Sequence, residues 1–267
     1  MTRTILLFLL SVVSLSAQDW ARQQLERSPR HREWITVQHD GRSVAAFVVY
    51  PESSRKSPVV LVIHEIFGMT DWVESVADQL AAAGYIAIAP DLLSGMGPNG
   101  GRTNSFPSQD AVMEAIRDLK PDQITADLNA TADRALKFPA ANGKLFVAGF
   151  CWGGGQSFRF ATNRMDLASA FVFYGPPPPK EALARIKAPV YGFYGGNDER
   201  IDATISATEQ AMKALGKIYE PVVYQGAGHG FMRLGQNPSG DEPNHAANVK
   251  AREEAWARWK QLLKAHE

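Results

Sequence analysis

The stretch Gly149-Phe150-Cys151-Trp152-Gly153-Gly154-Gly155 decides the fold, because it has the pattern of a sharp turn between a strand and a helix. Small residues on both sides of the turn let the backbone pass without clashes. Cys151, the only cysteine in the sequence, stands at the tip, where most such turns carry a serine. The helix that follows favours a thiolate there. The pattern predicts a nucleophile. The alternative is a buried, unreactive cysteine in a glycine-rich turn.

Strand and helix patterns alternate on both sides of this turn. The apolar run at 58–63 predicts a strand buried on both faces, and 33–38 with 44–50 predict a hairpin that turns at Asp40-Gly41. We expect further strands at 85–89, 144–148, 168–174, 189–194 and 219–224, and helices at 71–83, 111–119, 123–138, 154–162, 202–215 and 244–265. This order predicts an α/β fold with a mostly parallel sheet flanked by helices.

The N-terminal segment has the pattern of a secretory signal peptide. Arg3 precedes an apolar run at 5–13, and small residues precede a predicted cleavage point after Ala17. A short membrane anchor is the alternative, but the apolar run is shorter than a bilayer requires. We therefore expect an exported protein with a signal peptide at 1–17, an arm at 18–32 and a single catalytic domain at 33–267.

Composition excludes several classes of partner. The 267 residues include 28 basic and 28 acidic side chains, a balance that disfavours nucleic acid or an anionic membrane. One cysteine and six scattered histidines have no metal-ligand spacing, and we find no phosphate-binding glycine motif. A single cysteine also excludes an internal disulfide. We expect no metal, no cofactor and a monomer.

Two other strand ends carry the partners that a thiol nucleophile needs. Asp198 follows the strand at 189–194, and His229 follows the strand at 219–224 in a glycine-rich loop. The carboxyl ends of parallel strands meet at one edge of a sheet. The chain order Cys151, Asp198, His229 matches the nucleophile, acid, histidine order of α/β-hydrolases. Asp202 is the alternative acid, although its position is also typical of the N-cap of the next helix.

The oxyanion that forms during acyl transfer needs two backbone donors. One is expected from the residue after the nucleophile, Trp152, and the other from the loop after the third strand, where we assign Ile66. Glu65 lies beside this second donor. A carboxylate there could accept a proton from the thiol, or it could form a salt bridge to an arginine or lysine. A permanent place beside a thiolate would be electrostatically costly.

Five motifs together resemble the dienelactone hydrolases (carboxymethylenebutenolidases), and the resemblance extends from about residue 33 to the C-terminus. The motifs are His64-Glu65-Ile66-Phe67-Gly68, Ala89-Pro90-Asp91-Leu92, Gly149-Phe150-Cys151-Trp152-Gly153-Gly154, Gly196-Asn197-Asp198 and Gly228-His229-Gly230-Phe231. The resemblance implies an eight-stranded α/β-hydrolase fold and Cys-His-Asp catalysis on small esters or lactones. It also implies that Glu65 meets the resting thiol and helps to generate the thiolate when substrate binds.

The resemblance extends to part of the substrate site. Arg233 stands where the family carries an arginine that holds the substrate carboxylate; a surface arginine is the alternative. The family's second such arginine has no counterpart before Arg102, which does not align with that role. Phe67 and Phe231 are assigned to substrate binding. Aromatic side chains that could line an apolar pocket are Trp72, Phe106, Trp152 and Phe231.

The sequence therefore predicts a hydrolase of small carboxylic esters or lactones that works through an acyl-enzyme. Two alternatives remain open. A ligand-binding or sensor protein on the same fold would be acylated without steady turnover, and an acyl transferase would pass the acyl group to an added alcohol or amine. Product analysis separates these functions.

Overall fold

Eight strands form one sheet in the order β1-β2-β4-β3-β5-β6-β7-β8 in the computed structural model, which describes residues 19–267. The strands are β1 (Arg32–His39), β2 (Arg42–Val49), β3 (Ser57–Ile63), β4 (Ile86–Pro90), β5 (Ala141–Phe150), β6 (Leu167–Phe173), β7 (Val190–Gly195) and β8 (Tyr219–Tyr224). Strand β2 pairs antiparallel with β1 and β4, and every other pairing is parallel. The predicted fold class is confirmed. The predicted signal peptide lies outside the described residues.

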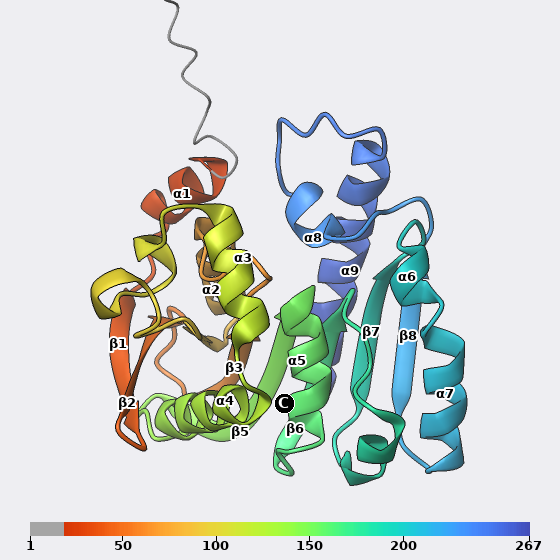
Figure 1. The fold of residues 1–267 in the computed structure, drawn as a ribbon, viewed down its shortest axis with the longest axis horizontal. Helices are drawn as coiled ribbons and strands as arrows, with labels where there is room; N and C mark the ends of the chain where they lie inside the picture. The colour runs from red at the N-terminus through yellow and green to blue at the C-terminus, as the bar shows by residue number, and fades with distance from the viewer. Residues whose placement is uncertain (1–18) are drawn as a thin grey trace, which may run out of the picture.

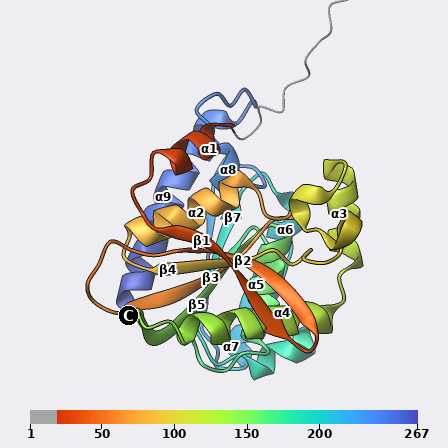
Figure 2. The same ribbon diagram turned by 90° about the vertical axis from the view of Figure 1, so that its left-hand side faces the viewer.

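The helices are α1 (Asp19–Glu26), α2 (Asp71–Ala82), α3 (Gln109–Asp118), α4 (Pro121–Leu136), α5 (Trp152–Ala161), α6 (Glu199–Asp202), α7 (Ile205–Ala214), α8 (Phe231–Leu234) and α9 (His245–Ala265). Figure 2 looks along the layers and shows α2 and α9 on one face of the sheet and α4 and α5 on the other. Short 3₁₀ turns interrupt the loop between β4 and α3 and the connection from β6 to β7.

Strand β3 shows why the sheet is covered on both faces. All seven of its residues are buried. Val59, Leu61 and Ile63 pack in one apolar cluster with side chains of α4 and α5, whereas Val60 and Val62 pack in a second cluster with α2 and α9. Side chains alternate between the two faces of a strand, so a continuous apolar run needs an apolar layer on each side.

The hairpin at the start of the domain follows the sequence prediction. Asp40 and Gly41 have φ values of 45° and 75°, and His39 pairs with Arg42 across a two-residue turn. Positive φ at both central residues defines the type I′ turn, which suits the right-handed twist of paired strands. Asp-Gly is among the sequences that adopt this turn at little cost.

The single helix predicted at 202–215 was wrong. Residues 202–215 form two helices, because α6 ends at Asp202 and α7 begins at Ile205 after its N-cap Thr204. Asp202 is therefore the last residue of α6 and not an N-cap. The four-residue helix α8 also went unpredicted, since it is too short to show a helical period.

The carboxyl ends of the parallel strands share one edge of the sheet. In Figure 1 this edge is marked by α6 and α8, which follow β7 and β8, and the turn from α7 into β8 lies at the opposite edge. Loops at the carboxyl edge bring together residues that are far apart in the chain. Within residues 19–267, no helix is long and apolar enough to cross a membrane.

Candidate active site

Cys151 stands alone between β5 and α5 in a strained backbone conformation. Its φ and ψ are 56° and −118°, a region that residues with side chains rarely adopt. Its N–H donates to the carbonyl of Phe173 on the neighbouring strand (3.0 Å), which holds the turn against the sheet. The side chain is partly exposed and forms no disulfide. The backbone thus presents the sulfur at the tip of a sharp turn, as the sequence predicted.

The glycines around Cys151 are required by close backbone contacts. A Cβ atom on Gly149 would overlap the carbonyl of Gly153, and a Cβ on Gly153 would overlap the carbonyls of Ile63 and His64. A Cβ on Gly154 would meet the carbonyl of Phe173. These contacts show that α5 begins directly against the ends of β3 and β6, which brings Cys151 beside the loop that follows β3.

His229 and Asp198 form the second part of the site. Nδ1 of His229 lies 2.5 Å from Oδ2 of Asp198, which is 8% exposed. The two loops are tied together by their backbones, because Asn197 donates its N–H to the carbonyl of Ala227 (2.9 Å) and its side-chain amide to the carbonyl of Gly226 (3.0 Å). The structure therefore brings the predicted acid and histidine into direct contact.

The imidazole of His229 also interacts with the sulfur of Cys151. Burial acts to lower the pKa of His229, but hydrogen bonding and charge interaction with Cys151 and Asp198 outweigh it and raise this pKa to about 9. Hydrogen-bond acceptors and negative charge beside an imidazole stabilise its protonated form. The three residues predicted from separate strand ends are thus brought together, in the order sulfur, imidazole, carboxylate.

Asp202, the alternative acid, does not contact His229. Its Oδ1 is buried and has no hydrogen-bond partner within the described part of the chain. Burial, with a smaller effect from the charge of Asp198, raises the pKa of Asp202. The two acids therefore differ in environment, and Asp198 is the one that can orient the imidazole.

Glu65 and Arg233 form a buried ion pair at the same edge. Nε of Arg233 donates to Oε2 of Glu65 at 2.7 Å, and only 2% of Glu65 is exposed. The phenol of Tyr174 donates to Oε1 of Glu65 at 3.5 Å. The guanidinium of Arg233 also lies over the ring of Phe67, 5.1 Å from its centroid. Two residues to which the sequence gave separate roles are therefore partners of each other, as in the salt-bridge alternative for Glu65.

Tyr174 is a site residue that the sequence analysis missed. It follows β6 directly, has a φ of 40°, and is fully buried. Its ring packs edge-to-face on His229 (5.1 Å between centroids), and its hydroxyl reaches Glu65. Burial raises its pKa well above the ordinary value, and the charge of Glu65 adds to this. Site residues in such sheets follow the carboxyl ends of strands, and the position of Tyr174 directly after β6 was the signal that could have identified it.

The expected oxyanion donors lie in two chain segments that contact each other, because a Cβ on Gly153 would overlap the carbonyl of His64. Trp152 is the first residue of α5, and the first N–H groups of a helix have no intrahelical acceptor. Ile66 lies in a tight turn in which the N–H of Gly68 donates to the carbonyl of Glu65 (3.1 Å). Both side chains are half-buried. The ring of His64 stacks on Trp152 and bonds to the carbonyl of Glu65; this residue is buried, and the sequence analysis gave it no role.

The predicted substrate pocket needs correction. Phe231 is fully buried and packs against Tyr174 and Tyr224, and Trp72 is fully buried against Phe150. Both residues therefore belong to the core and are not exposed to a substrate. Aromatic side chains that are partly exposed and remain candidates for substrate contact are Phe67, Phe106 and Trp152.

The guanidinium of Arg102 lies over the ring of Trp34, 3.5 Å from its centroid. This contact gives Arg102 an aromatic partner on β1. Of the two arginines considered from the sequence, Arg233 is therefore the one that contacts a residue of the candidate active site, Glu65.

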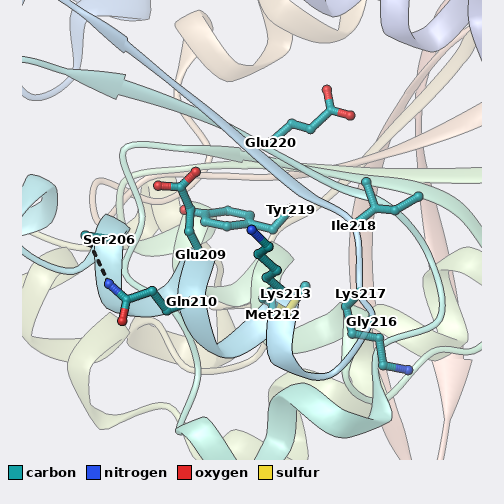
Figure 3. Close-up of a pocket in the computed structure, with 10 residues that line it drawn as sticks. All are labelled: Ser206, Glu209, Gln210, Met212, Lys213, Gly216, Lys217, Ile218, Tyr219 and Glu220. Atoms are coloured by element: carbon teal, nitrogen blue, oxygen red, sulfur yellow. Dashed lines mark hydrogen bonds between the residues drawn. The ribbon is translucent and has the colours of Figure 1, made fainter.

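A separate pocket of about 570 Å³ lies at the opposite edge of the sheet (Figure 3). It is formed by the end of α7 and the start of β8, and its charged side chains are Glu209, Lys213, Lys217 and Glu220. Cys151, Asp198 and His229 do not line it. This pocket is therefore separate from the part of the surface that carries the Cys151, His229 and Asp198 side chains. Among residues 19–267 no cluster of three or more histidine, cysteine or acidic side chains is arranged to hold a metal ion.

A model of the dienelactone hydrolase family matches residues 44–267 of the chain. Among curated proteins, the chain is 34% identical over 204 residues to a "Putative carboxymethylenebutenolidase" of Methylorubrum extorquens, covering 70% of this chain and 68% of that protein. It is 30% identical over 246 residues to a protein of the same name from Escherichia coli, covering 87% of this chain and 86% of the relative.

Solved structures show the same fold. A crystal structure described as a putative dienelactone hydrolase from Klebsiella pneumoniae superimposes with a TM-score of 0.76 at 25% identity, covering 88% of this chain and 98% of the other. A dienelactone hydrolase-like promiscuous phosphotriesterase from metagenomic libraries gives a TM-score of 0.73 at 21% identity, with coverage of 88% and 98%.

Proposed function

This chain belongs to the dienelactone hydrolase family, and from that premise we propose that it hydrolyses small carboxylic esters or lactones with Cys151 as the nucleophile. The observation that carries the proposal is the line of contacts from the Cys151 sulfur to the His229 imidazole and on to the Asp198 carboxylate. A nucleophile, a base in hydrogen-bond reach and a group that orients the base are the parts required for covalent catalysis.

The reaction proceeds in two halves. The sulfur of Cys151 attacks the carbonyl carbon, and the N–H groups of Ile66 and Trp152 stabilise the negative oxygen that results. The imidazolium of His229 gives its proton to the departing alkoxide, which leaves an acyl thioester on Cys151. The neutral imidazole then takes a proton from water while the water oxygen attacks the thioester. Collapse of this second intermediate releases the acid and returns the thiolate and the imidazolium.

The electrostatics of the site favour this cycle. Because the pKa of His229 is raised to about 9, the imidazole holds its proton at neutral pH. The proton needed by the leaving group is therefore already on His229 before substrate arrives. Asp198 accepts a hydrogen bond from the Nδ1–H of His229 and so stabilises the protonated ring. The same bond directs Nε2 away from the acid.

Glu65 and Arg233 support a role in substrate selection. The ion pair uses Nε of Arg233, and a substrate carboxylate would compete for the same guanidinium. Release of Glu65 would then leave a buried carboxylate near the thiol, where it can accept a proton. We therefore place Arg233 in carboxylate recognition and Glu65 in thiol activation, as the resemblance to the family implies.

The test is ester hydrolysis by the wild type and by Cys151→Ala. We expect the variant to lose about 10³-fold or more of kcat while keeping its circular dichroism spectrum and its unfolding temperature. Retained turnover in the variant would refute a cysteine nucleophile. Steady hydrolysis after the acylation burst argues against a sensor, and an unchanged acid-to-alcohol product ratio with added amine argues against an acyl transferase.

The proposal extends to location. The pattern of residues 1–17 supports export, and we propose that the mature protein begins near Gln18. N-terminal sequencing of the protein recovered from outside the cytoplasm tests this, and a mature protein that keeps residues 1–17 would contradict it.

A further inference from the structure

We propose that His64 is a positioning residue for the oxyanion hole: its imidazole fixes the Glu65–Ile66 peptide, whose N–H is one oxyanion donor, and packs on Trp152, which supplies the other. This inference rests on the proposed function, because it assigns a role within the same ester hydrolysis. Nothing in the triad itself uses His64.

The two ring nitrogens of His64 bond to backbone groups of opposite kind. Nδ1 lies 2.8 Å from the carbonyl oxygen of Glu65, which can only accept, so Nδ1 carries the proton. The N–H of Leu92 points at Nε2 at 3.4 Å and can only donate, so Nε2 carries the lone pair. The partners therefore select one neutral tautomer of a side chain with no solvent exposure.

The bond to Glu65 controls the Ile66 N–H through the geometry of the peptide group. The carbonyl of Glu65 and the N–H of Ile66 belong to the same planar trans peptide and point in opposite directions. Holding the carbonyl towards His64 therefore holds the N–H on the other side. Without this bond the peptide can rotate, and oxyanion donors are effective only when they are pre-aimed at the oxygen.

His64 reaches the second donor by ring stacking. Its ring and that of Trp152 are nearly parallel, with centroids 5.6 Å apart and planes 13° apart. A Cβ on Gly153 would overlap the carbonyl of His64, so the start of α5 rests directly on this residue. One imidazole thus contacts both of the chain segments that supply oxyanion donors.

The loop around Asp91 packs against His64 and favours a neutral, fixed imidazole. Burial lowers the pKa of His64, although the charge of Asp91 opposes this. Asp91, which is also fully buried, accepts bonds from the N–H and hydroxyl of Thr103 (3.0 and 2.7 Å) and from the N–H of Leu93 (3.1 Å). The N–H of Met69 in turn donates to the Thr103 hydroxyl (3.2 Å). This network ties the loop carrying Leu92 to the loop carrying Ile66.

A matched pair of variants separates the two bonds of His64. His64→Asn keeps a donor at the place of Nδ1 and loses the acceptor for Leu92. His64→Gln keeps an acceptor near the place of Nε2 and loses the short donor to Glu65. We expect His64→Gln to lower kcat for an activated ester by about 10²-fold, the effect of one lost oxyanion donor, with KM little changed. His64→Asn should retain kcat within about tenfold.

Alkylation of Cys151 by iodoacetamide serves as the control, because that reaction needs the thiolate and uses no oxyanion hole. It should be unchanged in both variants. Equal kcat in the wild type and both variants, or a loss of kcat that is matched by a loss of alkylation, would overturn the proposal. If His64→Gln does not fold, the kcat of His64→Asn is the test. A loss of kcat well beyond tenfold in that variant would contradict the proposal. A wild type that hydrolyses no ester refutes the proposed function instead and is thus a distinguishable failure.

Discussion

The Cys151–His229–Asp198 cluster and the Glu65–Arg233–Tyr174 cluster occupy the same edge of the sheet, but different kinds of interaction hold them in place. The first is fixed mainly by the backbone: a strained turn, glycines in close contact and hydrogen bonds between the loops after β7 and β8. The second is fixed by a buried ion pair between residues 168 positions apart. The backbone bonds around the first cluster do not involve a charge that a substrate could replace, whereas a side-chain ion pair can open when a competing charge arrives.

In the proposed mechanism, the first cluster performs the chemistry and the second selects the substrate. The triad cluster must keep its geometry through every step, so its loops are tied together before substrate binds. The Glu65–Arg233 pair can exchange partners, and its buried charges are costly when left alone. Changes in the first cluster should therefore affect all substrates, and changes in the second should affect substrates according to their charge.

The largest effect is expected from Asp198→Asn. The amide has no negative charge to stabilise the imidazolium, and its NH₂ can donate to Nδ1 and hold the ring in the wrong tautomer. We therefore expect kcat to fall by about 10³–10⁴-fold for acidic and neutral esters alike. Steady-state kinetics on both ester classes measures this. Asp202→Asn is the matched control four residues further on, and it should change kcat by less than about threefold because Asp202 does not contact His229. A larger loss in the Asp202 variant would reverse the assignment of the acid.

A smaller and more selective effect is expected from Arg233→Ala. It removes the group proposed to bind a substrate carboxylate, so kcat/KM for esters with a free carboxylate should fall about tenfold or more, and neutral esters should change less. Arg233→Lys keeps the charge and should recover part of the loss. Equal losses on both ester classes would mean that the pair is structural only.

The same variant also tests the ion pair in the absence of substrate. Arg233→Ala leaves Glu65 buried without its cation, which should cost about 3 kcal/mol of unfolding free energy. Adding Glu65→Gln should recover part of that stability. No recovery in a denaturant titration of the double variant would show that the two charges do not depend on each other.

The smallest effect is a pH dependence of stability. The pKa of His229 is about 9 in the folded protein and 6.5 ordinarily, so its protonation stabilises the fold fully below pH 6.5 and this contribution is lost as the pH rises through 9. The difference in unfolding free energy between the wild type and His229→Asn should therefore shrink across that range. In a Cys151→Ala background the slope should be weaker, since the sulfur supplies part of the shift. A difference that grows with pH would contradict the charged imidazole.

The sequence predicted the triad cluster because its signals are local. Positive φ at Cys151 and the close approach of α5 leave a glycine pattern, and Asp198 and His229 directly follow strands. Each of these signals lies within a short stretch of the sequence. The alternation of strands and helices then brings the strand ends together, so the local signals are enough to predict the cluster.

The rest of the site depends on side-chain contacts between distant segments. No local pattern distinguishes an arginine that is free to bind substrate from one already paired with Glu65. Phe231 follows a glycine-rich loop and was assigned to the pocket, yet it is the first residue of α8 and its buried ring packs against Tyr174. The break at Asp202 also lacks a signal, because neither glycine nor proline marks it.

The most direct test of the account is mass spectrometry of the protein quenched during turnover of an activated ester. We expect an added acyl mass on the peptide that contains Cys151, present in the wild type, accumulated in His229→Asn and absent in Cys151→Ala. An acyl group on any other residue, or turnover in Cys151→Ala at the wild-type rate, would contradict it.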